Sequence, residues 1–96
     1  QNRCGKAFST LLEEVSRSLY TTTNGSVPPA GTAVEIILAK RLTAVLKNGT
    51  DIGVLPTMYN YLAGCIKEGY SYTGTVLSSG MTPVPNITID VVPHEP

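Results

Sequence analysis

The chain is poor in charged residues. Only 15% of its 96 residues are Asp, Glu, Lys or Arg, against the roughly 25% typical of soluble domains, and the net charge is zero. The seven Lys and Arg are scattered, so the chain lacks the clustered basic side chains that neutralise nucleic-acid phosphates. A free monomer with so few charges is poorly protected against association. We therefore expect no nucleic-acid ligand, and an exterior covered by protein partners or by glycans.

Long apolar runs are also missing. The longest, residues 36–39, stops at Lys40, far short of the 18 or so residues that a membrane span needs. We therefore expect no membrane span. The chain begins at Gln1, with neither an initiator Met nor a signal peptide, which predicts that it is processed or excised from a longer polypeptide.

Residues able to carry chemistry are few and scattered. His94 is the only histidine and stands two residues from the end, where a solvated tail seldom holds an imidazole against a nucleophile. Glu13 and Glu14 are neighbours that a helix would point apart, and Asp51 and Asp90 are isolated. Phosphate-binding and dinucleotide glycine patterns are absent, as are paired metal ligands. The sequence thus predicts no catalytic, cofactor-binding or metal site.

The two cysteines, Cys4 and Cys65, leave two interpretations open. Their spacing does not show that they meet, which favours two free thiols, one near the terminus and one buried on a helix. In an oxidising compartment they could instead form one disulfide, closing a loop of about 60 residues and contributing about 4 kcal/mol on the chain-entropy model.

Three Asn-x-Ser/Thr triplets begin at Asn24, Asn48 and Asn86. In a secreted eukaryotic protein they would accept glycans on surface loops. Ser and Thr are common in this chain, however, and two of the triplets contain Asn-Gly, which is itself a turn signal. We therefore favour turns over glycan sites.

Three segments read as helices. Residues 6–20 carry apolar side chains at helical spacing, and residues 32–47 begin with a capping-box pattern at Thr32 and Glu35. Residues 56–69 begin with Pro56 and end at Gly69. A rival interpretation makes residues 32–38 a strand, because alternating Val and Ile also suit a sheet.

The last 27 residues change to a period of two. Residues 70–77 and 86–92 alternate as strands, with a turn expected at residues 78–80. The prolines around them allow an edge strand but argue against a central one. The two strands either pair as a hairpin on the helices, or the last dozen residues form an arm that joins a neighbouring subunit. The predicted fold is α+β in one domain, with a three-helix core over residues 1–69 followed by a β-rich hairpin or arm over residues 70–96.

Tyrosine is the main aromatic resource, because the chain has one Phe and no Trp. A tyrosine pairs an apolar ring with a polar tip, which suits half-wet protein contacts. The alternative is that the tyrosines complete an undersized core. The candidate interface combines the clustered tyrosines with the apolar residues of the last strand: Tyr59, Tyr61, Tyr70, Tyr72, Ile87, Ile89 and Val91.

These features favour a non-enzymatic structural or assembly subunit, such as a virion or phage particle component, that works through contacts with other protein subunits as a homo- or hetero-oligomer. The first alternative is a small secreted, glycosylated binding domain with one disulfide. The second is an accessory domain or processed chain of an enzyme. An extracellular or virion-associated location fits the first two, and a cytoplasmic location stays open.

Overall fold

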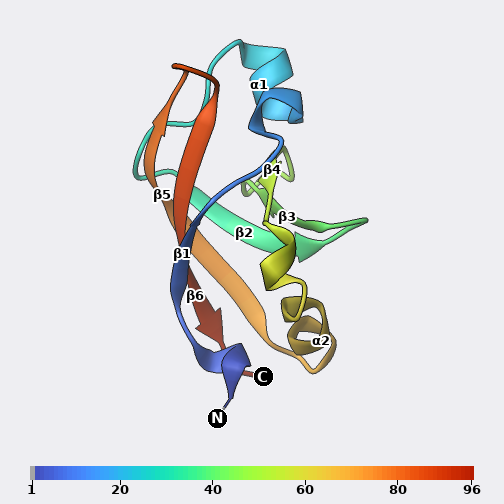
Figure 1. Cartoon of the computed structure of the whole chain (residues 1–96). Coiled ribbons are helices and arrows are strands. Elements are labelled where there is room, and N and C mark those ends of the chain that lie inside the picture. The colour runs from blue at the N-terminus through green and yellow to red at the C-terminus, as the bar shows by residue number, and fades with distance from the viewer. Residues whose placement is uncertain (1) are drawn as a thin grey trace.

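The protein is built on one antiparallel sheet of six strands (Figure 1). The structure, a computed structural model, describes residues 2–96. The strands are β1 (Phe8–Leu11), β2 (Ala33–Leu38), β3 (Leu42–Val45), β4 (Asp51–Val54), β5 (Ser71–Gly80) and β6 (Asn86–His94). They lie in the order β1-β6-β5-β2-β3-β4. The sheet curls into a half-barrel whose two edges meet where Glu13, just past β1, exchanges backbone hydrogen bonds of 2.8 and 2.9 Å with Val54.

The core fills the concave side of this curled sheet. Alternate residues of β2 and β6 point inward, as the two-residue repeat of a strand requires. Val34 and Ile36 of β2 are buried in this way, while Ala33 and Glu35 between them are exposed. The other strand residues of the core are Leu42, Ala44, Ile52, Tyr72, Val76, Ile87, Ile89 and Val91.

Helices are short and lie at the margins of the sheet. The two α-helices are α1 (Leu19–Asn24) and α2 (Leu62–Lys67), and the 3-10 turns are η1 (Arg3–Gly5), η2 (Val15–Arg17) and η3 (Thr57–Tyr59). Ser18 caps α1 by accepting a hydrogen bond from the Thr21 amide. In α2, Leu62 and Cys65 are buried and join the same core as the strands.

The predicted three-helix core is wrong. Residues 6–20 form β1, η2 and the start of α1 in place of one helix. Leu11 and Leu19, which the helical spacing placed on the buried stripe, are exposed, while Leu12 and Val15 are buried. The apolar residues of this segment were therefore spaced by chance at a helical period.

Residues 32–47 form the β2–β3 hairpin, so the rival strand interpretation of residues 32–38 describes this segment and the helix does not. The pairing runs from Glu35 opposite Val45 to Leu38 opposite Leu42. Of the helix predicted over residues 56–69, only η3 and the six residues of α2 are helical.

The C-terminal segment is neither an appendage nor an arm. β5 and β6 pair along their lengths, but they lie in the interior of the sheet, with β2 beyond β5 and β1 beyond β6. Their turn lies beyond Gly80, whereas residues 78–80 belong to β5. The proline argument for an edge strand fails because β1 pairs only with residues 88–91 of β6, which leaves Pro93 outside that ladder.

Candidate functional site

The carboxylates predicted to be solvated or isolated act as structural acceptors. Asp90 Oδ1 accepts a hydrogen bond of 2.8 Å from the Thr75 amide, and Asp51 Oδ2 accepts one of 3.2 Å from the Leu19 amide. His94 is not a free tail residue, because it ends β6 and its Nε2 lies 2.7 Å from Thr73 Oγ1. Within residues 2–96, no three His, Cys, Asp or Glu side chains are grouped to hold a metal ion.

The helices over residues 2–96 are all too short or too polar to cross a membrane.

Four of the seven candidate interface residues lie inside the protein. Tyr72, Ile87, Ile89 and Val91 are buried, so in the folded chain they offer no surface to a partner. The hydroxyl of Tyr72 donates a hydrogen bond of 2.7 Å to the carbonyl oxygen of Cys4. Burial raises the pKa of this tyrosine, and the neighbouring Tyr61 and Tyr70 raise it further.

The other three tyrosines of the candidate interface contact the chain's own N-terminal segment. Tyr59 stacks on Phe8 of β1, with ring centroids 4.4 Å apart. The guanidinium of Arg3 lies 3.7 Å from the centre of the Tyr61 ring, and the Asn2 amide donates to the Tyr70 hydroxyl. The tyrosine cluster is therefore occupied largely by contacts within the chain.

Cys4 and Cys65 form a disulfide, with Cα atoms 5.6 Å apart, and so are not the two free thiols that their spacing favoured. The bond joins η1 to α2 across 61 positions of sequence. Together with the tyrosine contacts, it fastens residues 2–4 beside the starts of β1 and β5.

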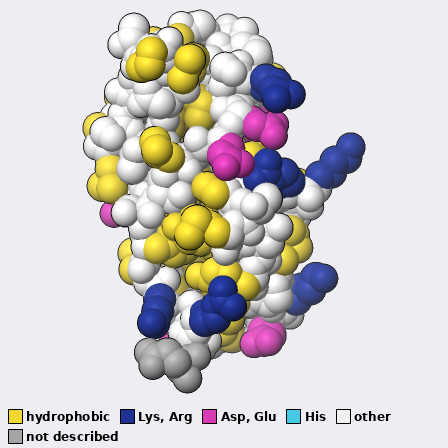
Figure 2. Space-filling view, viewed as in Figure 1, with side chains coloured by type: hydrophobic (Ala, Val, Ile, Leu, Met, Phe, Trp, Pro, Cys, Tyr) yellow, Lys and Arg dark blue, Asp and Glu magenta, His cyan; other side chains and the backbone are white. Residues whose placement is uncertain are grey.

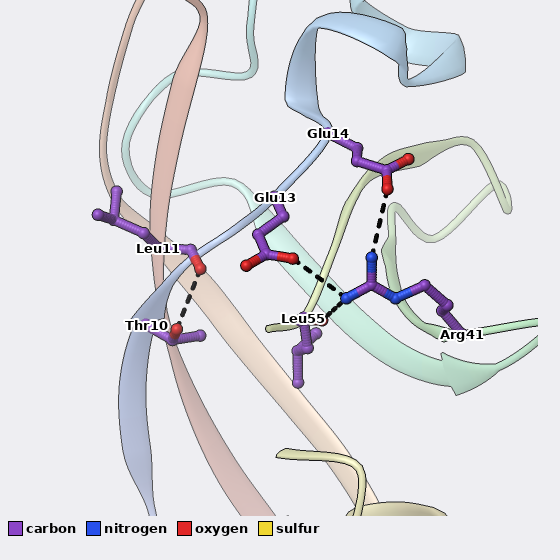
Figure 3. A network of polar contacts seen from close by, with 6 residues as sticks. All are labelled: Thr10, Leu11, Glu13, Glu14, Arg41 and Leu55. Carbon is purple, nitrogen blue, oxygen red and sulfur yellow. Dashed lines mark hydrogen bonds and ion pairs between the residues drawn. The ribbon is translucent and has the colours of Figure 1, made fainter. Parts of the chain in front are cut away.

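Beside the Glu13–Val54 backbone pair, Arg41 makes a second link between the two edges of the sheet (Figure 3). Its guanidinium donates to Glu13 Oε1 at 3.1 Å, to Glu14 Oε2 at 3.3 Å and to the carbonyl of Leu55 at 2.7 Å. A hollow of about 520 Å³ lies beside it on the outer side of β2–β4, lined in part by Ile37, Thr43 and Asp51. Arg41 is already paired with two carboxylates and a carbonyl. It is therefore not free to bind an anion in this hollow or to act there as a catalytic cation.

At one end of the molecule, two stretches of the chain carry no ionisable side chain. We call it the hairpin end and define it as residues 25–33 and 75–89, two stretches that contain no Asp, Glu, Lys, Arg, His, Cys or Tyr. Backbone bonds of 2.8 and 2.9 Å join Val76 to Gly31 and Thr32, and Ser79 Oγ donates to the Pro28 carbonyl at 2.6 Å. Two uncharged stretches far apart in sequence thus form one surface.

Large apolar side chains are exposed on the hairpin end. Leu77 is 50% exposed, Met81 41% and Val84 62%. Figure 2 shows hydrophobic and uncharged side chains at the upper end of the molecule, whereas most of the visible charged side chains lie along the right side and at the lower end. The uncharged tail is evident from the sequence. The predicted interface nevertheless fell on buried residues of that tail, because no turn was predicted at residues 81–85.

Comparison with protein-family models, with curated proteins and with solved structures finds no match to this chain.

Proposed function

We propose that this protein is a non-enzymatic assembly subunit that docks onto another protein through the hairpin end. The observation that carries the proposal is that exposed Leu77, Met81 and Val84 lie on a surface whose two stretches, residues 25–33 and 75–89, contain no ionisable side chain. Depletion of charge with retention of large apolar side chains is what marks the centre of protein interfaces.

Electrostatics favour this end over the rest of the surface. Docking there removes no ion from water, whereas covering the Arg41 region would desolvate Arg41 together with Glu13 and Glu14. The partner that fits is a protein surface that is itself apolar and uncharged, because a charge placed against the hairpin end would find no counter-ion there.

The hairpin end is also held in place before any partner arrives. β5 and β6 are the two longest strands and lie in the interior of the sheet, and Ser79 is tied to Pro28 of the neighbouring loop. A surface that is ordered in advance loses little conformational entropy on binding, which favours affinity.

The test places a photo-crosslinking amino acid at position 84 in the source cells, with position 58 as the control. Met58 is exposed, like Val84, but lies in η3 outside the hairpin end. We expect position 84 to capture a protein that position 58 does not. With that protein purified, Val84→Lys should weaken binding at least about tenfold and Met58→Lys should leave it unchanged. Equal capture at the two positions, or equal affinity of the two variants, would contradict the proposal.

The location we propose for this assembly is extracellular or on the surface of a particle. The Cys4–Cys65 bond supports it, because disulfides persist in oxidising surroundings and are rare in the cytosol. Recovery of the protein from its source with both thiols alkylatable before reduction would contradict this location.

A secreted, glycosylated binding domain is the second candidate, favoured by the disulfide and by the exposure of Asn24 and Asn48. Asn86 fits a glycan less well, because its amide nitrogen donates to the carbonyls of Thr82 and Val84, and the amide nitrogen of Asn24 likewise donates to the Tyr20 carbonyl, which leaves Asn48 as the best acceptor. After expression in a eukaryotic secretory line, this candidate predicts a mass that falls on treatment with a peptide N-glycosidase and that is reduced in Asn48→Gln. An unmodified mass would exclude it.

A further inference from the structure

The N-terminal segment, residues 2–7, depends on the disulfide more than any other part of the fold does. The strand ladder begins only at Phe8, and the backbone hydrogen bonds that this segment makes stay within its own 3-10 turn, η1. All of its residues are exposed except Cys4, which is half-buried. The segment therefore contributes no side chain to the core and no strand to the sheet, and the Cys4–Cys65 bond is its covalent anchor.

The other contacts of the N-terminal segment are single polar or cation–π contacts with the tyrosine cluster. They join residues 2–4 to the hydroxyl groups of Tyr70 and Tyr72 and to the ring of Tyr61. Contacts of this kind are individually weak when they are exposed to water. Ordering a segment of chain opposes them, because each fixed residue loses conformational entropy. Without the disulfide, we therefore expect the N-terminal segment to detach.

The disulfide lies beside an opening to solvent. A hollow of about 320 Å³ is lined by both cysteines and by Gly64 of α2. A Cβ added at Gly64 would meet nothing within 4 Å, so no side chain closes the hollow from this wall. Cys4 is half-buried whereas Cys65 is only 3% exposed, and an incoming thiolate therefore meets Cys4 first.

We infer that the Cys4–Cys65 bond is a redox switch, which a small thiol opens to release the N-terminal segment while the six-stranded sheet stays folded. A thiolate attacks Cys4 Sγ and forms a mixed disulfide with it, and Cys65 leaves as a thiolate that takes up a proton. A second thiol attacks the mixed disulfide, which yields the Cys4 thiol and the oxidised, disulfide-linked form of the small thiol. The small thiol is thus oxidised as the protein disulfide is reduced.

The pairing of the sheet does not include the released segment. β1 pairs with β6 through residues 8–11, and the backbone bonds between Glu13 and Val54 lie further along the chain. Release would instead leave the ring of Tyr61 and the hydroxyl groups of Tyr70 and Tyr72 without their partners in residues 2–4. The reduced protein therefore presents the tyrosine cluster, which the oxidised protein covers.

The test is amide hydrogen exchange of the full chain, oxidised and after reduction by excess 2-mercaptoethanol. In the oxidised protein the amides of Cys4, Gly5 and Lys6 donate hydrogen bonds within the N-terminal turn. We expect these amides to exchange at least about tenfold faster after reduction, because the released turn frays. The amides of β5 and β6 should keep their protection in both forms. Cys4→Ser combined with Cys65→Ser should show the fast exchange without any reductant.

Two further variants separate the roles of the disulfide and of the hollow. Tyr72→Phe removes one tyrosine contact and keeps the disulfide, so its oxidised form should retain the slow exchange of the wild type. Gly64→Leu adds a side chain at the wall of the hollow and should slow reduction by 2-mercaptoethanol at least about threefold, since the rate of exchange depends on access to the sulfur. Ala63→Leu, the same added side chain at a position outside the lining, is the matched control and should leave the rate unchanged. Alkylation of the freed thiols followed by mass spectrometry measures this rate.

Loss of protection throughout β5 and β6 on reduction would overturn the inference, because the bond would then support the whole fold and not one segment. Equal exchange at residues 4–6 in the oxidised and reduced proteins would overturn it too, and so would equal reduction rates in Gly64→Leu and Ala63→Leu. These outcomes are independent of the proposed function, because the hairpin end lies at the opposite end of the molecule from the N-terminal turn (Figure 1).

Discussion

The hydroxyl of Tyr72 donates a hydrogen bond of 2.7 Å to the carbonyl oxygen of Cys4, 68 positions earlier in the chain. Tyr72 lies in β5, in the interior of the sheet, and Cys4 lies in the N-terminal turn that the disulfide fastens to α2. One phenol therefore links the centre of the sheet to the segment that precedes β1. Its burial, reinforced by Tyr61 and Tyr70, raises its pKa above the ordinary value of 10.0.

Alkaline pH should destabilise the protein through Tyr72. Below pH 10 the phenol is protonated in the folded and unfolded states, and its contribution to stability is constant. As the pH rises through 10, the unfolded phenol ionises first, so the free energy of unfolding falls until the pH passes the raised pKa of the folded state. Urea unfolding of the wild type between pH 8 and 11, a range of about three units, should show this fall.

Tyr72→Phe is the control for that pH dependence. The variant loses the hydrogen bond to Cys4, so we expect it to be less stable by about 1 kcal/mol near neutral pH. Since it has no phenol at position 72, its stability should decline less steeply above pH 10. Identical slopes in the two proteins would show that Tyr72 does not carry the effect.

Reduction of the Cys4–Cys65 bond should destabilise the fold by about 4 kcal/mol, because the bond restricts a long loop in the unfolded chain. The measurement is urea unfolding with and without a reductant that does not itself denature the protein. Cys4→Ser combined with Cys65→Ser should match the reduced wild type and should not respond to reductant. A double variant as stable as the oxidised protein would contradict the prediction.

Arg41→Met should reduce stability by about 1–2 kcal/mol, because it removes two exposed ion pairs and leaves the carbonyl of Leu55 without its donor. High salt should reduce the difference in stability between Arg41→Met and the wild type only in part, since the hydrogen bond from Arg41 to the Leu55 carbonyl is not an ion pair. Arg17→Met is the matched control, because the described residues give Arg17 no ion pair. An equal loss of stability in Arg41→Met and Arg17→Met would contradict this prediction.

The sequence predicted the β-rich character of the last third because its signal there was local. Residues 86–91 alternate strictly, and Ile87, Ile89 and Val91 are all buried on one face of β6. In residues 32–47 the same kind of alternation was present at Val34 and Ile36, but Ile37 and Leu38 broke it. Both of those side chains are exposed, so they imitated a broad helical stripe that no helix buries.

Pairing partners could not be predicted, because they depend on residues distant in sequence. β6 lies between β5 and β1, its residues pair with β1 residues 77 or more positions away, and no local pattern in residues 8–11 indicates that contact. The same holds for the candidate site. The hairpin end appears only when the stretch around Pro28 meets the stretch around Ser79, whereas the sequence showed two unrelated uncharged loops.

Two glycines give a matched test of the fold. Gly74 of β5 lies against β6, where an added Cβ would stand 1.9 Å from the Asp90 carbonyl oxygen. Backbone atoms in the middle of a sheet cannot move aside cheaply, so Gly74→Ala should reduce stability by about 3 kcal/mol or more. Gly64 of α2 is exposed, and an added Cβ would meet nothing within 4 Å, so Gly64→Ala should raise stability by up to about 1 kcal/mol. Chemical denaturation of the two variants beside the wild type measures both changes. If Gly74→Ala proved neutral, β5 and β6 could not pair in the register described, with Gly74 opposite Val91.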